Sequence, residues 1–204
     1  MHPIERLRYV ARAGSVPDRI LVAETVPGLV GFARQPGPLL VALRQLIGRQ
    51  PESPGLLCLG ARMLAALDPI EAAWEFVDAL EDDPSTATAD QLAIDEAGGL
   101  ELIESIASAP GTLLCPSGST AWIESARARG RNVSVLTPLG SRLPRLLFQG
   151  FVERLGVDDG PGSLERVPIG SIDELVGPEG VVEISKWTVD APDVAELGSF
   201  SLRR

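Results

Sequence analysis

Histidine is almost absent from this sequence: one of its 204 residues is a histidine, and this residue, His2, lies at the amino terminus. Most zinc sites and the Ser-His-Asp triad of many hydrolases need histidine beside other ligands or beside a nucleophile. The two cysteines, Cys58 and Cys115, are far apart, and neither belongs to a CxxC pair. They therefore indicate no disulfide framework and no metal knuckle. We expect neither a metal nor another cofactor.

Basic charge is also scarce. Lys186 is the only lysine, and the formal net charge is −10 at pH 7. Proteins that bind nucleic acid usually present a basic face to the phosphates. The charge balance therefore argues against a nucleic-acid partner.

Long apolar runs are missing as well. Leu56–Leu59 and Leu64–Leu67 are separated by Arg62, and no run approaches the ~20 apolar residues of a membrane helix. The first twelve residues contain several arginines without an apolar segment after them, unlike a secretory signal. We expect no membrane association and a cytoplasmic location.

What the sequence does contain is a first half with apolar residues at helical spacing. Asp68 followed by Pro69 is typical of a helix start, with the aspartate as N-cap. Between residues 14 and 38, prolines and glycines leave room only for short helices. The predicted helices span residues 4–13, 39–47, 56–67, 68–80 and 84–108.

After residue 108 the pattern changes to short apolar runs that alternate with helices. This order indicates a parallel sheet whose faces are covered by the connecting helices. We predict an α/β fold with two domains, a helical segment over 1–95 and a small Rossmann-like parallel sheet over 96–204. Strands are predicted at 112–114, 132–137, 166–169, 175–176 and 181–184, and helices at 121–129 and 144–155.

A loop of small polar residues, Ser117, Gly118, Ser119 and Thr120, joins the first predicted strand to its helix. The start of a helix has free backbone N–H groups and a partial positive charge, and the hydroxyls add further donors. Open α/β sheets bind ligands at such strand ends. The pattern predicts a phosphate-binding loop. The alternative is that these serines and the threonine only cap the helix.

Four segments also resemble a known family, and the first of them, Arg49–Pro51 with the apolar helix after it, is similar to the family's "RPTAVNL" segment. Gly111–Trp122 is similar to the "ILTHGNSSTV" segment of the translation initiation factor 2B alpha/beta/delta family. Val133–Thr137 with Arg142 resembles its "VIVTESRP" segment, and Ile172–Val182 its "VDLVLVGAEGVV" segment. The order and spacing agree loosely over residues 39–186. The chain resembles a divergent, shortened member of this family, which is related to methylthioribose-1-phosphate and ribose-1,5-bisphosphate isomerases.

The resemblance implies roles for particular residues. The isomerases use a cysteine and an aspartate as acid and base. An ungapped match puts Pro116 at the cysteine position, one residue after Cys115, and Glu179 at the aspartate position. Cys115 and Glu179 are thus the catalytic candidates. Arg142, near the end of a predicted strand, is a candidate phosphate clamp. The alternatives are an inert buried cysteine, a turn glutamate and a surface arginine.

Three functions fit this sequence. The first is a sensor or regulatory protein that binds a phosphorylated sugar or nucleotide. The second is an isomerase of a sugar 1-phosphate that uses Cys115 and Glu179, and this is implied by the resemblance alone. The third is a non-catalytic assembly protein. The family typically dimerises, so the resemblance also implies a homodimer.

Overall fold

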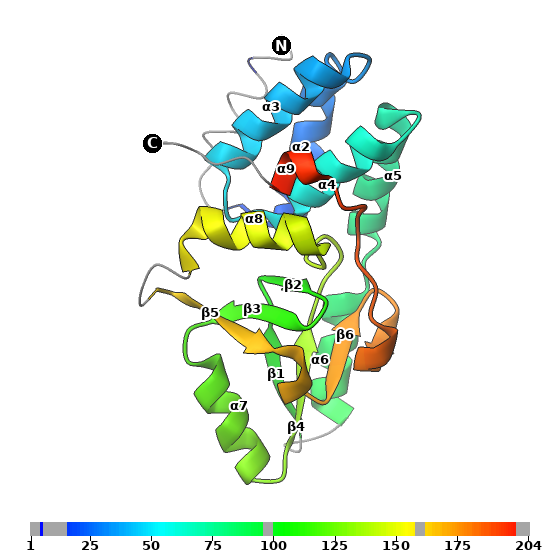
Figure 1. Ribbon diagram of the computed structural model, residues 1–204. Helices are drawn as coiled ribbons and strands as arrows, with labels where there is room; N and C mark the ends of the chain where they lie inside the picture. Colours follow the sequence, from blue (N-terminus) through cyan, green and yellow to red (C-terminus); the bar gives the residue numbers. More distant parts are fainter. Residues whose placement is uncertain (1–4, 6–15, 96–99, 158–161, 199–204) are drawn as a thin grey trace. The chain divides into compact units, whose positions relative to one another are not determined.

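The computed structural model of the protein describes residue 5 and residues 16–95, 100–157 and 162–198 (Figure 1). Apart from residue 5, the helix predicted over 4–13 lies outside the described residues. The chain divides into two compact units, and each unit is assembled from separate stretches of sequence. We call them the helical unit (Met1–Asp82, Pro144–Leu155, Ala191–Arg204) and the sheet unit (Asp83–Leu143, Gly156–Asp190). The boundary predicted after residue 95 falls inside the sheet unit.

The helical unit is built around α4 (Pro54–Ala65), which contacts four of its other helices. Nine of the twelve residues of α4 are buried, as expected for a helix in which Arg62 is the one charged residue. The helices around it are α2 (Asp18–Leu29), α3 (Pro36–Arg49), α5 (Pro69–Glu81) and α9 (Ala195–Gly198), and α8 (Arg145–Leu155) packs on α9.

Local sequence explains how these helices begin. Asp68 caps α5 as predicted, and its carboxylate accepts hydrogen bonds from the N–H groups of Ile70 and Glu71. The expectation of only short helices between residues 14 and 38 was wrong, because α2 has 12 residues. Pro17 is the N-cap of α2 and Pro27 lies in its last turn, so neither proline interrupts the middle of the helix.

The main sheet of the sheet unit has the strand order β1-β4-β6-β7. Its first three strands are parallel, and β7 forms an antiparallel hairpin with β6. Side chains alternate between the two faces. On one face, Val133 and Val135 pack with residues of α7, and on the other, Leu136 packs with Ala89 of α6. The elements are α6 (Ser85–Asp95), β1 (Leu100–Glu104), β4 (Asn132–Leu136), α7 (Ser119–Ala128), β6 (Glu174–Gly177) and β7 (Gly180–Val182).

A second, antiparallel sheet has the order β2-β3-β5, formed by Ala107–Ala109, Thr112–Pro116 and Leu164–Pro168. The predicted α/β fold is therefore confirmed, but β3 and β5, which were predicted as strands of the parallel sheet, belong to this antiparallel sheet. Two short 3₁₀ helices, Ile169–Ser171 and Ile184–Lys186, follow β5 and β7.

The long helix predicted over 84–108 was also wrong. Helix α6 ends at Asp95, and β1 and β2 occupy the later part of that range. Pairing with β4 over five residues and burial of Leu102 and Ile103 against the two faces outweigh the local helical pattern. Within the described part of the chain, no helix is both long and apolar enough to cross a membrane.

Candidate functional site

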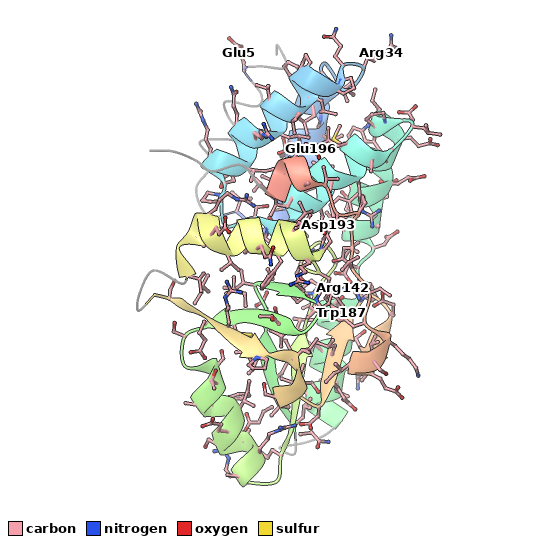
Figure 2. All side chains as sticks on the ribbon, in the orientation of Figure 1. Glu5, Arg34, Arg142, Trp187, Asp193 and Glu196 are labelled. Atoms are coloured by element: carbon pink, nitrogen blue, oxygen red, sulfur yellow. The ribbon has the colours of Figure 1, made fainter. Side chains whose placement is uncertain are left out.

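The site begins where two parallel strands end at the same edge of the main sheet. The chain after β4 reaches Arg142, and the turn after β6 contains Glu179. Parallel strands end together, which brings these two predicted residues into contact. Figure 2 labels Arg142 among the side chains of the structure. The Nη1 of Arg142 donates to Glu179 Oε2 at 2.9 Å and its Nη2 donates to Oε1 at 3.0 Å. This two-pronged arrangement is the strongest geometry for a guanidinium and a carboxylate.

A third residue, Asp190, holds Arg142 from the other side. Its Oδ1 accepts from Arg142 Nε at 2.8 Å, and its Oδ2 accepts from the backbone N–H groups of Gly140 and Arg142 at 2.7 and 3.0 Å. Arg142 and Asp190 are each only 4% exposed. Asp190 therefore fixes both the loop that carries Arg142 and the orientation of the guanidinium. Asp190 was not among the predicted site residues, and it lies 48 residues from its partner in the chain.

Burial and charge shift the pKa values of Glu179 and Asp190 in opposite directions. Hydrogen bonds from Arg142 lower the pKa of Glu179, whose side chain is half exposed. Burial raises the pKa of Asp190, although the charge and hydrogen bonds of Arg142 act in the opposite direction. Glu179 is thus held as a carboxylate by Arg142 while one side of it remains open to solvent.

Two small residues lie next to this cluster. A Cβ on Gly177 would lie 3.2 Å from Glu179 Oε2 and 3.4 Å from Arg142 Nη1, so a side chain here would crowd the ion pair. Ser108 of β2 forms a parallel bridge with Arg142. Its side chain is fully buried, and its Oγ has no hydrogen-bond partner among the described residues.

The predicted phosphate-binding loop lies elsewhere, at the end of β3 and the start of α7. Its anion position is occupied by the carboxylate of Glu165, which accepts from the Thr120 N–H at 2.6 Å. Hydrogen bonds from the backbone of Thr120, and then of Gly118 and Ser119, lower the pKa of Glu165. The helix start thus holds an anion, in keeping with its N–H groups and dipole. In this structure the anion is supplied by the chain itself.

The hydroxyls of the loop are engaged as well. Ser117 Oγ donates to the carbonyl oxygen of Gly162 at 2.6 Å, and Ser119 Oγ donates to that of Pro116 at 2.6 Å. Among the described residues, no hydrogen bond or ion pair joins this loop to Arg142 or to its carboxylate partners. The structure therefore brings Arg142 and Glu179 together but gives the loop a separate set of partners.

Cys115 lies inside the core of the sheet unit. It is fully buried on β3 and packs in one cluster with Leu113, Val135 and Val167. Burial, and then the charge of Glu165, raise the pKa of the Cys115 thiol to about 12. A neutral, enclosed thiol is poorly suited to exchange a proton with a bound ligand at neutral pH.

This environment predicts how the two cysteines react. Cys58 and Cys115 are both buried and lie outside any disulfide, so neither should react with a thiol reagent such as DTNB in the native protein at neutral pH. Both should react promptly in concentrated urea, which serves as the control. Rapid release of one equivalent of dye under native conditions would contradict the buried position of one thiol.

The geometry places the chain among α/β proteins with an attached helical segment. No protein-family model matches the sequence, and no curated protein matches it either. Solved structures do resemble it. They include eIF2B beta from Chaetomium thermophilum, with a TM-score of 0.61 at 10% identity over 89% of this chain and 86% of that one.

Two further structures have a TM-score of 0.60. The tetrameric eIF2B-beta2-delta2 complex from C. thermophilum matches at 12% identity over 90% of each chain. The translation initiation factor eIF-2B from Pyrococcus horikoshii OT3 matches at 10% identity over 89% of this chain and 96% of that one. At such identities the likeness concerns the fold, and at that level the resemblance predicted from the sequence is confirmed.

Proposed function

We propose that this protein binds a phosphorylated small molecule, a sugar phosphate or a nucleotide, and acts as a sensor or regulatory protein without transforming its ligand. The observation that carries the proposal is the environment of Arg142. Its buried guanidinium lies at the ligand-binding edge of a parallel sheet and holds a two-oxygen anion from a half-exposed side chain. Arginine in this geometry suits a phosphate as well as a carboxylate.

The loop Ser117–Thr120 is a second proposed phosphate contact. Its backbone N–H groups already hold the carboxylate of Glu165, which supports an affinity for anions. A phosphate reaches these groups only if Glu165 leaves them. We therefore place the main anion contact at Arg142.

A binding role fits the site better than isomerisation. The isomerase hypothesis needs Cys115 and Glu179 to exchange protons with one ligand. Cys115 is enclosed in the core with a raised pKa, whereas Glu179 is bound to Arg142. Conversion of a sugar 1-phosphate by the pure protein, lost in a Cys115→Ala variant, would restore the catalytic hypothesis.

Assembly belongs to the proposal as well. One of the neighbouring structures is a tetrameric complex, and we propose that this chain forms a homodimer. Sedimentation equilibrium tests this directly, and a monomer at all concentrations would contradict it.

The binding proposal is tested by thermal unfolding in the presence of phosphorylated pentoses, methylthioribose phosphate, nucleotides and inorganic phosphate. A ligand that binds only the folded state raises the midpoint in a saturable way. We expect such a rise with a phosphorylated compound and none with its dephosphorylated parent. Arg142→Lys keeps the charge but loses the two-pronged guanidinium, and should weaken binding of the phosphorylated compound by about tenfold. Arg127→Lys, at an exposed ion pair with Asp173, is the control.

Two outcomes would contradict the proposal. An equal shift with the dephosphorylated parent would show that the phosphate is not recognised. No shift with any of these compounds would leave an assembly protein that has this fold without a ligand site.

A further inference from the structure

The guanidinium of Arg142 has two sides with unlike partners. On the inner side lies Asp190, whose side chain is 1% exposed and which also holds two backbone N–H groups. On the outer side lies Glu179, whose side chain is 50% exposed. Both side-chain hydrogen bonds that the Glu179 carboxylate accepts come from Arg142. Glu179 can leave Arg142 for water without breaking the bonds that hold the loop, whereas Asp190 cannot.

The backbone around Glu179 favours the same conclusion. Gly177 and Gly180 pair across the hairpin, so Glu179 belongs to the two-residue turn between β6 and β7. A rotation of its side chain leaves this pairing intact. Glu165, the other glutamate that binds a predicted phosphate contact, lies within β5 in register with Cys115. Its carboxylate is fixed close to the start of α7 by the strand that carries it.

Ser108 supplies an independent observation. It faces Arg142 across a parallel bridge, and facing residues of a strand pair project their side chains to the same side. Its Oγ is a fully buried hydroxyl without a partner in the described structure, and such groups are rare because they lose their hydrogen bonds to water. A carboxylate uses both of its oxygens on Arg142, while a phosphate has a further oxygen that can accept from Ser108.

We infer that Glu179 is an internal stand-in for the anionic group of the ligand: a phosphate takes its two places on Arg142, gains the hydroxyl of Ser108, and displaces Glu179 into solvent. Asp190 stays in place and keeps the guanidinium oriented. This inference rests on the proposed function and adds which carboxylate is exchanged. It also makes Glu179 a competitor whose removal strengthens binding.

The test is calorimetric titration of inorganic phosphate into wild-type protein and Glu179→Gln at neutral pH. The neutral amide competes less for Arg142, so the variant should bind phosphate at least about tenfold more tightly. Glu183→Gln is the matched control, because Glu183 is 71% exposed and pairs only with the exposed Lys186 among the ion pairs of the described residues. Its affinity for phosphate should equal that of the wild type.

The Ser108 hydroxyl is tested in the Glu179→Gln background with phosphate and acetate. Ser108→Ala should weaken the binding of phosphate severalfold and leave the binding of acetate unchanged, since acetate has no third oxygen. Equal weakening of both anions would overturn the role of Ser108.

The outcomes separate this inference from the proposed function. Phosphate binding that is the same in wild type and Glu179→Gln overturns the stand-in role but leaves the binding function. If Glu165→Gln binds phosphate more tightly than the wild type while Glu179→Gln binds it with wild-type affinity, the inference is overturned and the loop at the start of α7 is the phosphate site. No binding of phosphate or of any phosphorylated compound by wild type or by either variant overturns both.

Discussion

Replacing Arg142 with alanine is expected to lower the free energy of unfolding by about 3–5 kcal/mol, the range for removing one partner of a buried ion pair. Asp190 is 4% exposed and would keep its position without the cation that faces it. Urea unfolding followed by circular dichroism measures the loss. Arg127→Ala is the matched control, since its ion pair with Asp173 is exposed on both sides, and it should cost less than about 1 kcal/mol.

A double variant makes this prediction sharper. Arg142→Ala combined with Asp190→Asn removes the buried charge together with its partner, keeps an oxygen for the two backbone N–H groups, and should be more stable than Arg142→Ala alone. A double variant that is the less stable of the two would contradict the argument, as would a loss in Arg142→Ala no larger than that of Arg127→Ala.

The second large effect is expected in the helical unit, at the contact between α8 and α9. A Cβ on Gly150 would overlap the carbonyl oxygen of Gly198. The clash is with backbone, so no change of side-chain rotamer relieves it, and Gly150→Ala should destabilise the protein by about 1–3 kcal/mol. Alanine has the better helix propensity, which means that a loss of stability would come from packing. Chemical denaturation of the purified variant measures it.

Gly37→Ala is the control for this substitution. Gly37 lies in the first turn of α3, and a Cβ there meets no atom within 4 Å apart from its chain neighbours and the helix's own backbone. This variant should be as stable as the wild type or slightly more stable, because alanine restricts the unfolded chain. If Gly150→Ala had the same free energy of unfolding as Gly37→Ala, the close approach of α8 and α9 would be refuted.

Local patterns predicted much of this fold because they act within one turn or one strand. The cap at Asp68 and the parallel strands β4 and β6 depend on residues that are adjacent or alternate in sequence. Each of Arg142 and Glu179 was a candidate by itself, and their contact was not predicted, although both come after parallel strands of one sheet. The predicted ligand roles of Arg142, Glu179 and the loop at Ser117–Thr120 stay predictions that the proposed experiments test.

What the sequence could not predict depends on partners that are distant along the chain. Glu165 binds the start of α7 from 45 residues away, and Asp190 binds Arg142 from 48 residues away. No spacing rule connects such residues, because only the folded sheet brings them together. The wrong helix over 84–108 has the same origin: β1 is stabilised by β4, about thirty residues later in the chain.

Because each unit is assembled from separate stretches of sequence, the two units are not completed in the order in which their first residues are synthesised. Chains emerge from the ribosome amino end first and fold as units become complete. The sheet unit is complete once Asp190 has emerged, whereas the helical unit still lacks α9, which packs on α3, α4 and α8. The helices that are synthesised first therefore complete their packing only after α9 has been synthesised. The part of the molecule that carries Arg142 can reach its final form before the part that precedes it in sequence.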